Sequence, residues 1–317
     1  MGSVTRAALD QKLALAKRCS HEGVMAGAKA AVLATVATAI PTAMLKNRVL
    51  KEGKGMERSG EEEEEEADTG NFATLVNGAA QCKLPYGMTY FNKPTGRASD
   101  GLLVIDFIAQ DLGLPLIPPS LSEGQNFRRG ANFALGWFEQ LKPLLCNTTE
   151  SCQDYFSKSL FVLGEFGGND YSSILSAGKS RSEAKSYIPV VINTIRQAAE
   201  SLLKQGALHI VIPGIIPSGC VPMRLTVKAS KNKSYYDNLG CLKEYNTIAF
   251  DHNMMLKETV VQLQSTYPWV KFIYADYFEP VIQFLQYPKT FGFTVKEPLR
   301  ICCGGGGPYK LQLKCYL

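Results

Sequence analysis

The alternation of short apolar runs with longer amphipathic stretches constrains the fold of this chain more than any other feature. The runs SLFVLGEF (159–166), ALHIVIPGI (207–215) and VKFIYADYF (270–278) have the character of buried strands. Between the first two runs, apolar residues recur at helical spacing up to Gly206. Such strand–helix–strand repeats predict a parallel sheet with helices on both faces, and chemistry at the carboxyl ends of its strands.

Composition divides the chain into three parts. Of its 317 residues 45% are hydrophobic and 20% are charged, which is typical of a globular protein. Residues 51–66, KEGKGMERSGEEEEEE, are charged and lack apolar periodicity. We therefore predict a helical segment at 1–50, a charged, disordered linker at 51–66 and an α/β domain at 67–317. The net charge is +5, and no basic stripe alternates with aromatic residues, so we expect no nucleic-acid partner.

The cysteine pattern indicates an oxidising compartment. Cys146 and Cys152 bracket a short polar loop, CNTTESC, and Cys220 and Cys241 bracket a longer one. Pairs of this kind predict disulfides that close loops, and the alternative is that they are free buried thiols.

Other sequence features give conflicting predictions of where the protein is located. Asn-X-Ser/Thr sequons at Asn147 and Asn232 predict glycosylation in the secretory pathway, unless they arise by chance. The first twenty residues, however, form a basic amphipathic pattern and no signal peptide. Residues 23–45 are apolar, rich in alanine and long enough to span a bilayer, although their hydrophobicity is weak. This segment favours membrane association of an intracellular protein.

Three glycine-containing motifs lie after strands or in loops. GANFALGW begins at Gly130, GEFGGNDY places Asn169 directly after a predicted strand, and CCGGGGPY occupies residues 302–309. Glycines let backbone amides approach a substrate, and an asparagine amide adds a donor, so the combination predicts stabilisation of an oxyanion. Each motif alone is typical of a turn. We expect no metal and no cofactor.

These motifs, together with ADTGNF (67–72), IPGIIPSGCVP and GCLKEYN, resemble the plant GDSL esterase/lipases of the SGNH hydrolase superfamily over about residues 67–309. The resemblance implies a flavodoxin-like three-layer α/β/α fold. It also implies secretion and hydrolysis of a small ester or lipid by a Ser–His–Asp arrangement. The family's oxyanion hole uses the amide of the nucleophile, a glycine and an asparagine, and the last two correspond here to Gly130 and Asn169.

The catalytic residues of the family do not carry over. Counting back along the first block places Glu65 at the position of the nucleophilic serine. The family's Asp-x-x-His block follows CCGGGGPY and is absent from this sequence, which ends at Leu317. Of the three histidines, His21, His209 and His252, none stands where a general base is expected. A stretch after RGANFAL is also shorter than in the family, so we expect an incomplete domain.

The first part of the chain has a resemblance of its own. Residues 9–42 are similar to the start of the plant early nodulins, which are small membrane-associated proteins. Three hypotheses follow: an active ester hydrolase, a non-catalytic binding or membrane-associated protein, and a chimaeric or truncated gene product. The third is favoured by three features: an N-terminal segment that resembles another family, the charged linker at 51–66, and the absence of the serine and Asp-x-x-His blocks. It predicts a member of the hydrolase family that does not turn over esters.

Overall fold

The computed structural model describes residues 69, 82–83, 86–97, 99, 101–122, 124–132, 138–293, 297–300 and 306–309. The predicted helical segment at 1–50, the linker at 51–66 and residues 302–305 of the CCGGGGPY motif lie outside these residues. Glu65 and His21 therefore lie outside them too.

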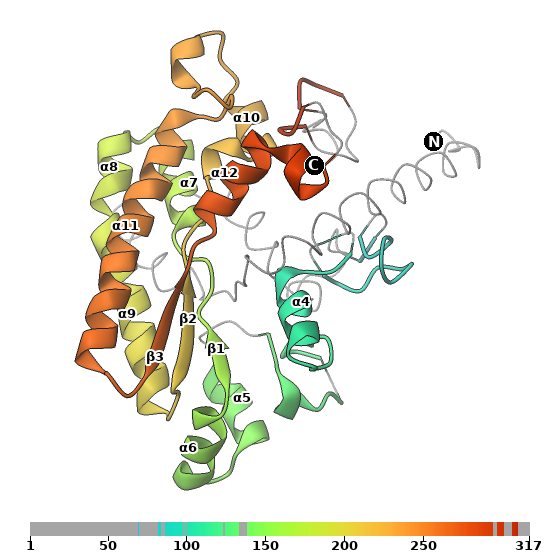
Figure 1. Ribbon diagram of the computed structural model, residues 1–317, viewed down its shortest axis with the longest axis vertical. Helices are drawn as coiled ribbons and strands as arrows, with labels where there is room; N and C mark the ends of the chain where they lie inside the picture. The colour runs from blue at the N-terminus through green and yellow to red at the C-terminus, as the bar shows by residue number, and fades with distance from the viewer. Residues whose placement is uncertain are drawn as a thin grey trace.

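A parallel sheet of three strands forms the centre of the described domain. Its strands are β1 (Leu160–Val162), β2 (His209–Pro213) and β3 (Lys271–Ala275), in the order β1-β2-β3. Figure 1 shows the three carboxyl ends pointing toward the same end of the molecule. The parallel pairing confirms the predicted α/β class.

The register of the strands places one row of large apolar side chains on the covered face of the sheet. Phe161 of β1 pairs with Ile210 of β2, which pairs with Phe272 of β3, and all three are buried in the main hydrophobic core. Successive side chains of a strand point to opposite faces. The next row accordingly ends at Ile273, which is 38% exposed. One face of the sheet is thus packed more completely than the other.

Helices α8, α9 and α11 lie together on one side of the sheet (Figure 1), and α11 packs against both α9 and β3. The α-helices are α4 (Val104–Asp111), α5 (Phe138–Leu145), α6 (Thr149–Ser157), α7 (Gly168–Ser176), α8 (Arg181–Ser186), α9 (Ile188–Lys204), α10 (Pro222–Val227), α11 (Lys243–Thr266) and α12 (Phe278–Gln286). The short 3-10 helices are η2 (Phe127–Arg129), η4 (Ser218–Cys220), η5 (Lys233–Tyr235) and η6 (Pro288–Phe291).

The helical stretch before Gly206 is two helices rather than one. The capping box of Ser180 and Glu183 begins α8, and α9 starts anew at Ile188, with a proline in its first turn. Proline fits the first turn of a helix but removes a backbone donor from its interior, which explains the break. After α9 the chain turns at Gly206, whose φ is 105°. A Cβ there would lie 2.8 Å from the Cα of Gln153, so glycine also allows close approach of α6.

Candidate functional site

The carboxyl edge of the sheet brings together the segments that follow the three strands. Glu165 follows β1, and its Oε1 accepts a hydrogen bond of 3.2 Å from the backbone N–H of Ile216, which follows β2. Tyr277 follows β3 and is buried. Burial raises the pKa of the Tyr277 hydroxyl well above its usual value, and the nearby Glu165 carboxylate raises it further. Active sites of parallel sheets lie at this edge.

Two asparagines of α11 hold the loop that follows β2. Asn253 accepts a hydrogen bond from the N–H of Ile215 at Oδ1 and donates one to the carbonyl of Ile215 from Nδ2, both 2.8 Å long. Asn246 accepts from the N–H of Gly219 at 2.9 Å. The two asparagines are about two helical turns apart and so share one face of α11. Their spacing aligns the loop with the helix.

Only glycine fits at position 219 of this loop. The Leu242 N–H donates to the Gly219 carbonyl at 2.9 Å, which draws the start of α11 against η4. A Cβ on Gly219 would lie 2.2 Å from the Leu242 carbonyl oxygen. The loop after β2 is therefore fixed by backbone contact as well as by side chains.

The segment after β1 forms a glycine turn that opens α7. Gly167 is the N-cap residue, with a φ of 99°, and Gly168 and Asn169 follow in the first turn of the helix. Asn169 is half-buried. The first backbone N–H groups of a helix lack partners within the helix and form its positive end. Together with the Asn169 amide they can donate hydrogen bonds to a carbonyl oxygen or an oxyanion.

The histidines differ sharply in environment. His209 begins β2, at the amino edge of the sheet, and its side chain is exposed. His252 of α11 is fully buried, and its Nδ1 hydrogen-bonds to the hydroxyl of Tyr171 at 2.9 Å. Burial lowers the pKa of His252 to about 3, so its imidazole is neutral at physiological pH. Its Nε2 has no hydrogen-bond partner among the residues that the structure describes.

Gly130 precedes β1 in the chain and Asn169 follows it. Gly130 follows η2 and has a φ of 133°. The carbonyl of Arg128 in η2 accepts a hydrogen bond of 2.7 Å from the Tyr155 hydroxyl of α6, the helix that precedes β1. Asn169, in contrast, follows the carboxyl end of β1. A shared oxyanion hole of Gly130 and Asn169 stays a prediction.

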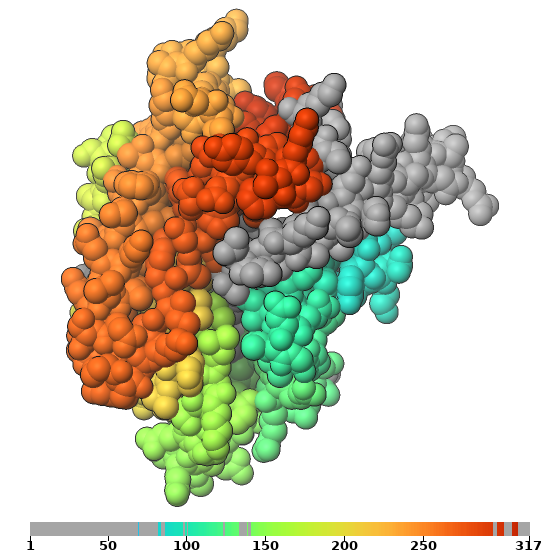
Figure 2. All heavy atoms as spheres, viewed as in Figure 1, coloured from blue at the N-terminus to red at the C-terminus, as the bar shows by residue number. Residues whose placement is uncertain are grey.

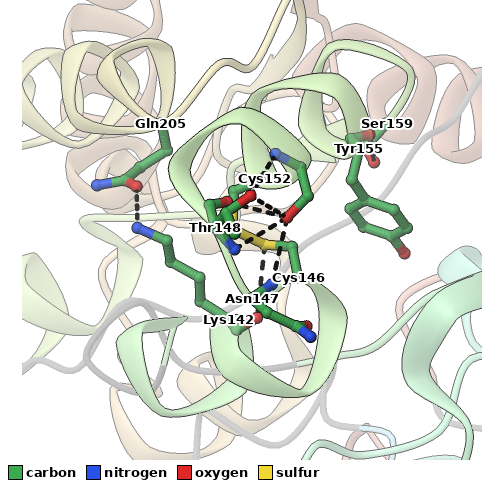
Figure 3. Close-up of a disulfide and its surroundings, with 9 residues drawn as sticks. Lys142, Cys146, Asn147, Thr148, Cys152, Tyr155, Ser159 and Gln205 are labelled. Atoms are coloured by element: carbon green, nitrogen blue, oxygen red, sulfur yellow. Dashed lines mark hydrogen bonds between the residues drawn. A yellow bond between two sulfur atoms is a disulfide. The ribbon is translucent and has the colours of Figure 1, made fainter.

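The four cysteines singled out in the sequence form two disulfides, Cys146–Cys152 and Cys220–Cys241. Figure 3 shows the first of them at the start of α6. There Thr148 accepts a hydrogen bond from the N–H of Ser151 and caps the helix. Lys142 of α5 reaches away from the disulfide to donate to Gln205.

The two sequons lie in different surroundings, and both asparagines are exposed. Asn147 lies inside the Cys146–Cys152 loop. Asn232 lies in the segment between α10 and α11, which projects from the body of the molecule in Figures 1 and 2. Its Oδ1 accepts hydrogen bonds from both the N–H and the hydroxyl of Ser234. Glycosylation at either asparagine stays a prediction.

Within the described part of the chain, no group of three His, Cys, Asp or Glu side chains could hold a metal ion. No helix in that part is long and apolar enough to cross a membrane. The apolar segment 23–45 lies outside it.

Two features of the site were not singled out from the sequence. Glu165 and Tyr277 stand at the carboxyl ends of the predicted strand runs 159–166 and 270–278, which was the signal available for both. Asn246 and Asn253 share one helix face, but that spacing alone does not reveal that the face meets the loop after β2.

Comparison with known proteins agrees with the motifs and the parallel sheet. Residues 67–308 match the family model of GDSL-like lipase/acylhydrolase, and residues 8–54 match that of the early nodulin 93 protein. Two GDSL esterase/lipases of Arabidopsis thaliana are 40% and 38% identical to the chain; each alignment covers 78% of this chain and, respectively, 76% and 72% of the relative. The sinapine esterase of Brassica napus is 36% identical, over 78% of this chain and 72% of its own length. The chain therefore belongs to the plant GDSL esterase/lipase family.

Proposed function

We propose that this chain binds a small ester or lipid at the carboxyl edge of its sheet and does not hydrolyse it through a serine nucleophile. Membership of the GDSL esterase/lipase family supports a ligand of this chemical class. The relative named sinapine esterase is one of the family's esterases. The half-buried Asn169 and the first turn of α7 supply donors for the ligand's carbonyl oxygen.

The observation that carries the proposal is Glu65 at the position of the nucleophile. The block that continues as ADTGNF has six consecutive glutamates where the family has its serine. A carboxylate acts as a nucleophile in some enzymes, but there it is activated by its surroundings. A run of like charges favours solvation over such an environment. Loss of one member of a catalytic triad lowers the rate by several orders of magnitude.

The two matches to family models also support the division of the chain. The early nodulin match ends at residue 54 and the lipase match begins at residue 67, so the glutamate run at 61–66 lies between them. We include in the proposal an early-nodulin-like segment at 1–50 and a hydrolase domain at 67–317, joined by this linker.

Two measurements on the purified full-length chain test the proposal. A fluorophosphonate probe labels activated serines, and we expect no stoichiometric labelling and no hydrolysis of 4-nitrophenyl butyrate above background. Binding is measured with N-(4-nitrophenyl)butanamide, the stable amide counterpart of that ester. We expect saturable binding that Asn169→Ala weakens about tenfold, the loss of roughly one good hydrogen bond. Labelling at one serine would identify an active hydrolase, and absence of binding would exclude the binding role.

A further inference from the structure

The glycine turn before α7 rests on a buried pair of side chains, Tyr171 of α7 and His252 of α11. Tyr171 is 3% exposed and His252 is fully buried. The hydroxyl of Tyr171 and the Nδ1 of His252 are 2.9 Å apart, and the two rings meet edge to face, with centroids 5.7 Å apart. The pair joins the helix that carries Asn169 to the helix that holds the loop after β2.

The turn itself is enclosed by these two side chains. A Cβ on Gly167 would lie 2.9 Å from the Tyr171 ring, 3.1 Å from Val191 and 3.2 Å from the His252 ring. The N–H of Tyr171 also donates to the carbonyl of Gly167 at 3.0 Å, which closes the first turn of α7. The position of Tyr171 therefore determines where the turn lies, and Asn169 stands between the two residues in the chain.

The pair is electrically neutral. Burial lowers the pKa of His252 to about 3. Burial, with the nearby Asp170 carboxylate as a second cause, raises the pKa of Tyr171 well above its usual value. Next to His252 on α11, Asp251 pairs with Lys185 of α8, with a distance of 2.5 Å between Nζ and Oδ2. The pair accordingly supplies a fixed geometry to the turn and no charge.

We infer that Tyr171 and His252 are positioning residues, whose hydrogen bond sets the direction in which the Asn169 amide and the first N–H groups of α7 meet a bound carbonyl oxygen. The ligand in this inference is that of the proposed function. The positioning of the turn itself is a property of the described residues alone.

The turn is tested by hydrogen exchange in the full-length chain. Tyr171→Phe removes the hydroxyl and keeps the ring. We expect the amides of residues 168–171 to exchange about tenfold faster, as for loss of roughly one hydrogen bond. Tyr155→Phe is the matched control, because it removes a tyrosine hydroxyl that donates to a backbone carbonyl elsewhere, from α6 to Arg128 of η2. His252→Gln keeps a polar partner for the Tyr171 hydroxyl. We therefore expect the amides of residues 168–171 to exchange more slowly in His252→Gln than in Tyr171→Phe. Equal exchange in Tyr171→Phe and the unmodified chain, or equal acceleration by the control, would overturn the inference.

A double-mutant cycle tests whether the pair acts through Asn169. Binding of N-(4-nitrophenyl)butanamide is measured in Tyr171→Phe, Asn169→Ala and the double variant. We expect Tyr171→Phe to weaken binding about threefold, and the double variant to bind no more weakly than Asn169→Ala. Additive losses would mean that Tyr171 acts by another route and would overturn the inference. If the unmodified chain does not bind the amide, the proposed function fails, and the exchange measurement still decides whether the pair fixes the turn.

Discussion

His252 and Asn253 are neighbours on α11 and illustrate how differently buried polar residues are accommodated. Asn253 uses both polar atoms of its amide on the backbone of Ile215. His252 uses Nδ1 on Tyr171 and leaves Nε2 without a partner among the described residues. A buried nitrogen without a partner costs stability, and a buried charge costs far more, so this histidine must stay neutral.

His252 should make the stability of the protein depend on pH. Its pKa is about 3 in the folded protein, below the usual value of 6.5 that applies to the unfolded chain. Its contribution to stability is therefore complete above pH 6.5. It is lost as the pH falls toward 3, because the unfolded chain then binds a proton that the folded chain does not. The slope is at most about 1.4 kcal/mol per pH unit.

Glutamine does not titrate in this pH range, so the variant His252→Gln should lack this pH dependence whether or not its stability at neutral pH changes. Urea unfolding of both proteins at pH 7.5 and pH 5.5 measures the effect. We expect the unmodified protein to lose more free energy of unfolding between the two pH values than the variant, by about 1.4 kcal/mol. Equal losses would show that His252 titrates normally in the folded protein.

At the scale of secondary structure, the loops that leave the strands and helices are closed by disulfides and side-chain hydrogen bonds. The Cys220–Cys241 disulfide spans a sequence separation of 21, and Asn246 contacts the same loop. The Cys146–Cys152 disulfide spans a separation of only 6. All four cysteines are buried, so the two pairs differ mainly in loop length.

Removing the longer disulfide should destabilise the protein more. The chain-entropy model gives about 3 kcal/mol for the pair Cys220→Ala and Cys241→Ala. It gives about 2 kcal/mol for Cys146→Ala and Cys152→Ala. Urea unfolding of the oxidised proteins compares the two double variants. A larger loss from the shorter loop would mean that packing of the cysteines, rather than loop closure, decides their contribution.

Sequence periodicity predicted the three strands and the helical stretch before Gly206, because each depends on residues close together in the chain. It did not show where this stretch divides into α8 and α9, although Pro189 in the first turn of α9 was visible. The contact between Glu165 and Ile216 joins residues 51 positions apart and depends on how β1 and β2 align. No local pattern encodes that alignment. Asn169 was found because its glycines mark a turn that local sequence does encode.

At the scale of the whole molecule, the segment before α5 has its own buried ion pair. Arg97 donates to both carboxylate oxygens of Asp106 at 2.9 Å and to the carbonyl of Ile117 at 3.1 Å. Asp106 is fully buried and also accepts from the N–H of Leu103 at the start of α4. The Tyr155 hydroxyl, bound to the Arg128 carbonyl, is one link from this segment to the body that carries the sheet.

The variant Asp106→Ala should show whether this segment unfolds together with the sheet. It leaves the buried Arg97 without its carboxylate, which costs about 3–5 kcal/mol. If the two parts form one cooperative unit, we expect the free energy of global unfolding, measured in urea, to fall by that amount. Asp154→Ala, which removes an exposed ion pair with Lys158, should cost less than about 1 kcal/mol. A separate early transition in Asp106→Ala alone would show that the segment unfolds independently of the sheet.

The two hydrogen bonds of the Asn253 side chain limit which amino acids can be tolerated at position 253. Its side-chain amide meets Ile215 as the backbone of a neighbouring strand would, with one donor and one acceptor. Aspartate would keep the acceptor but lose the donor, and leucine would lose both. In a library that samples every amino acid at each position of α11, position 253 should therefore tolerate fewer replacements than the equally buried Thr259, whose hydroxyl donates to the Met255 carbonyl of its own helix.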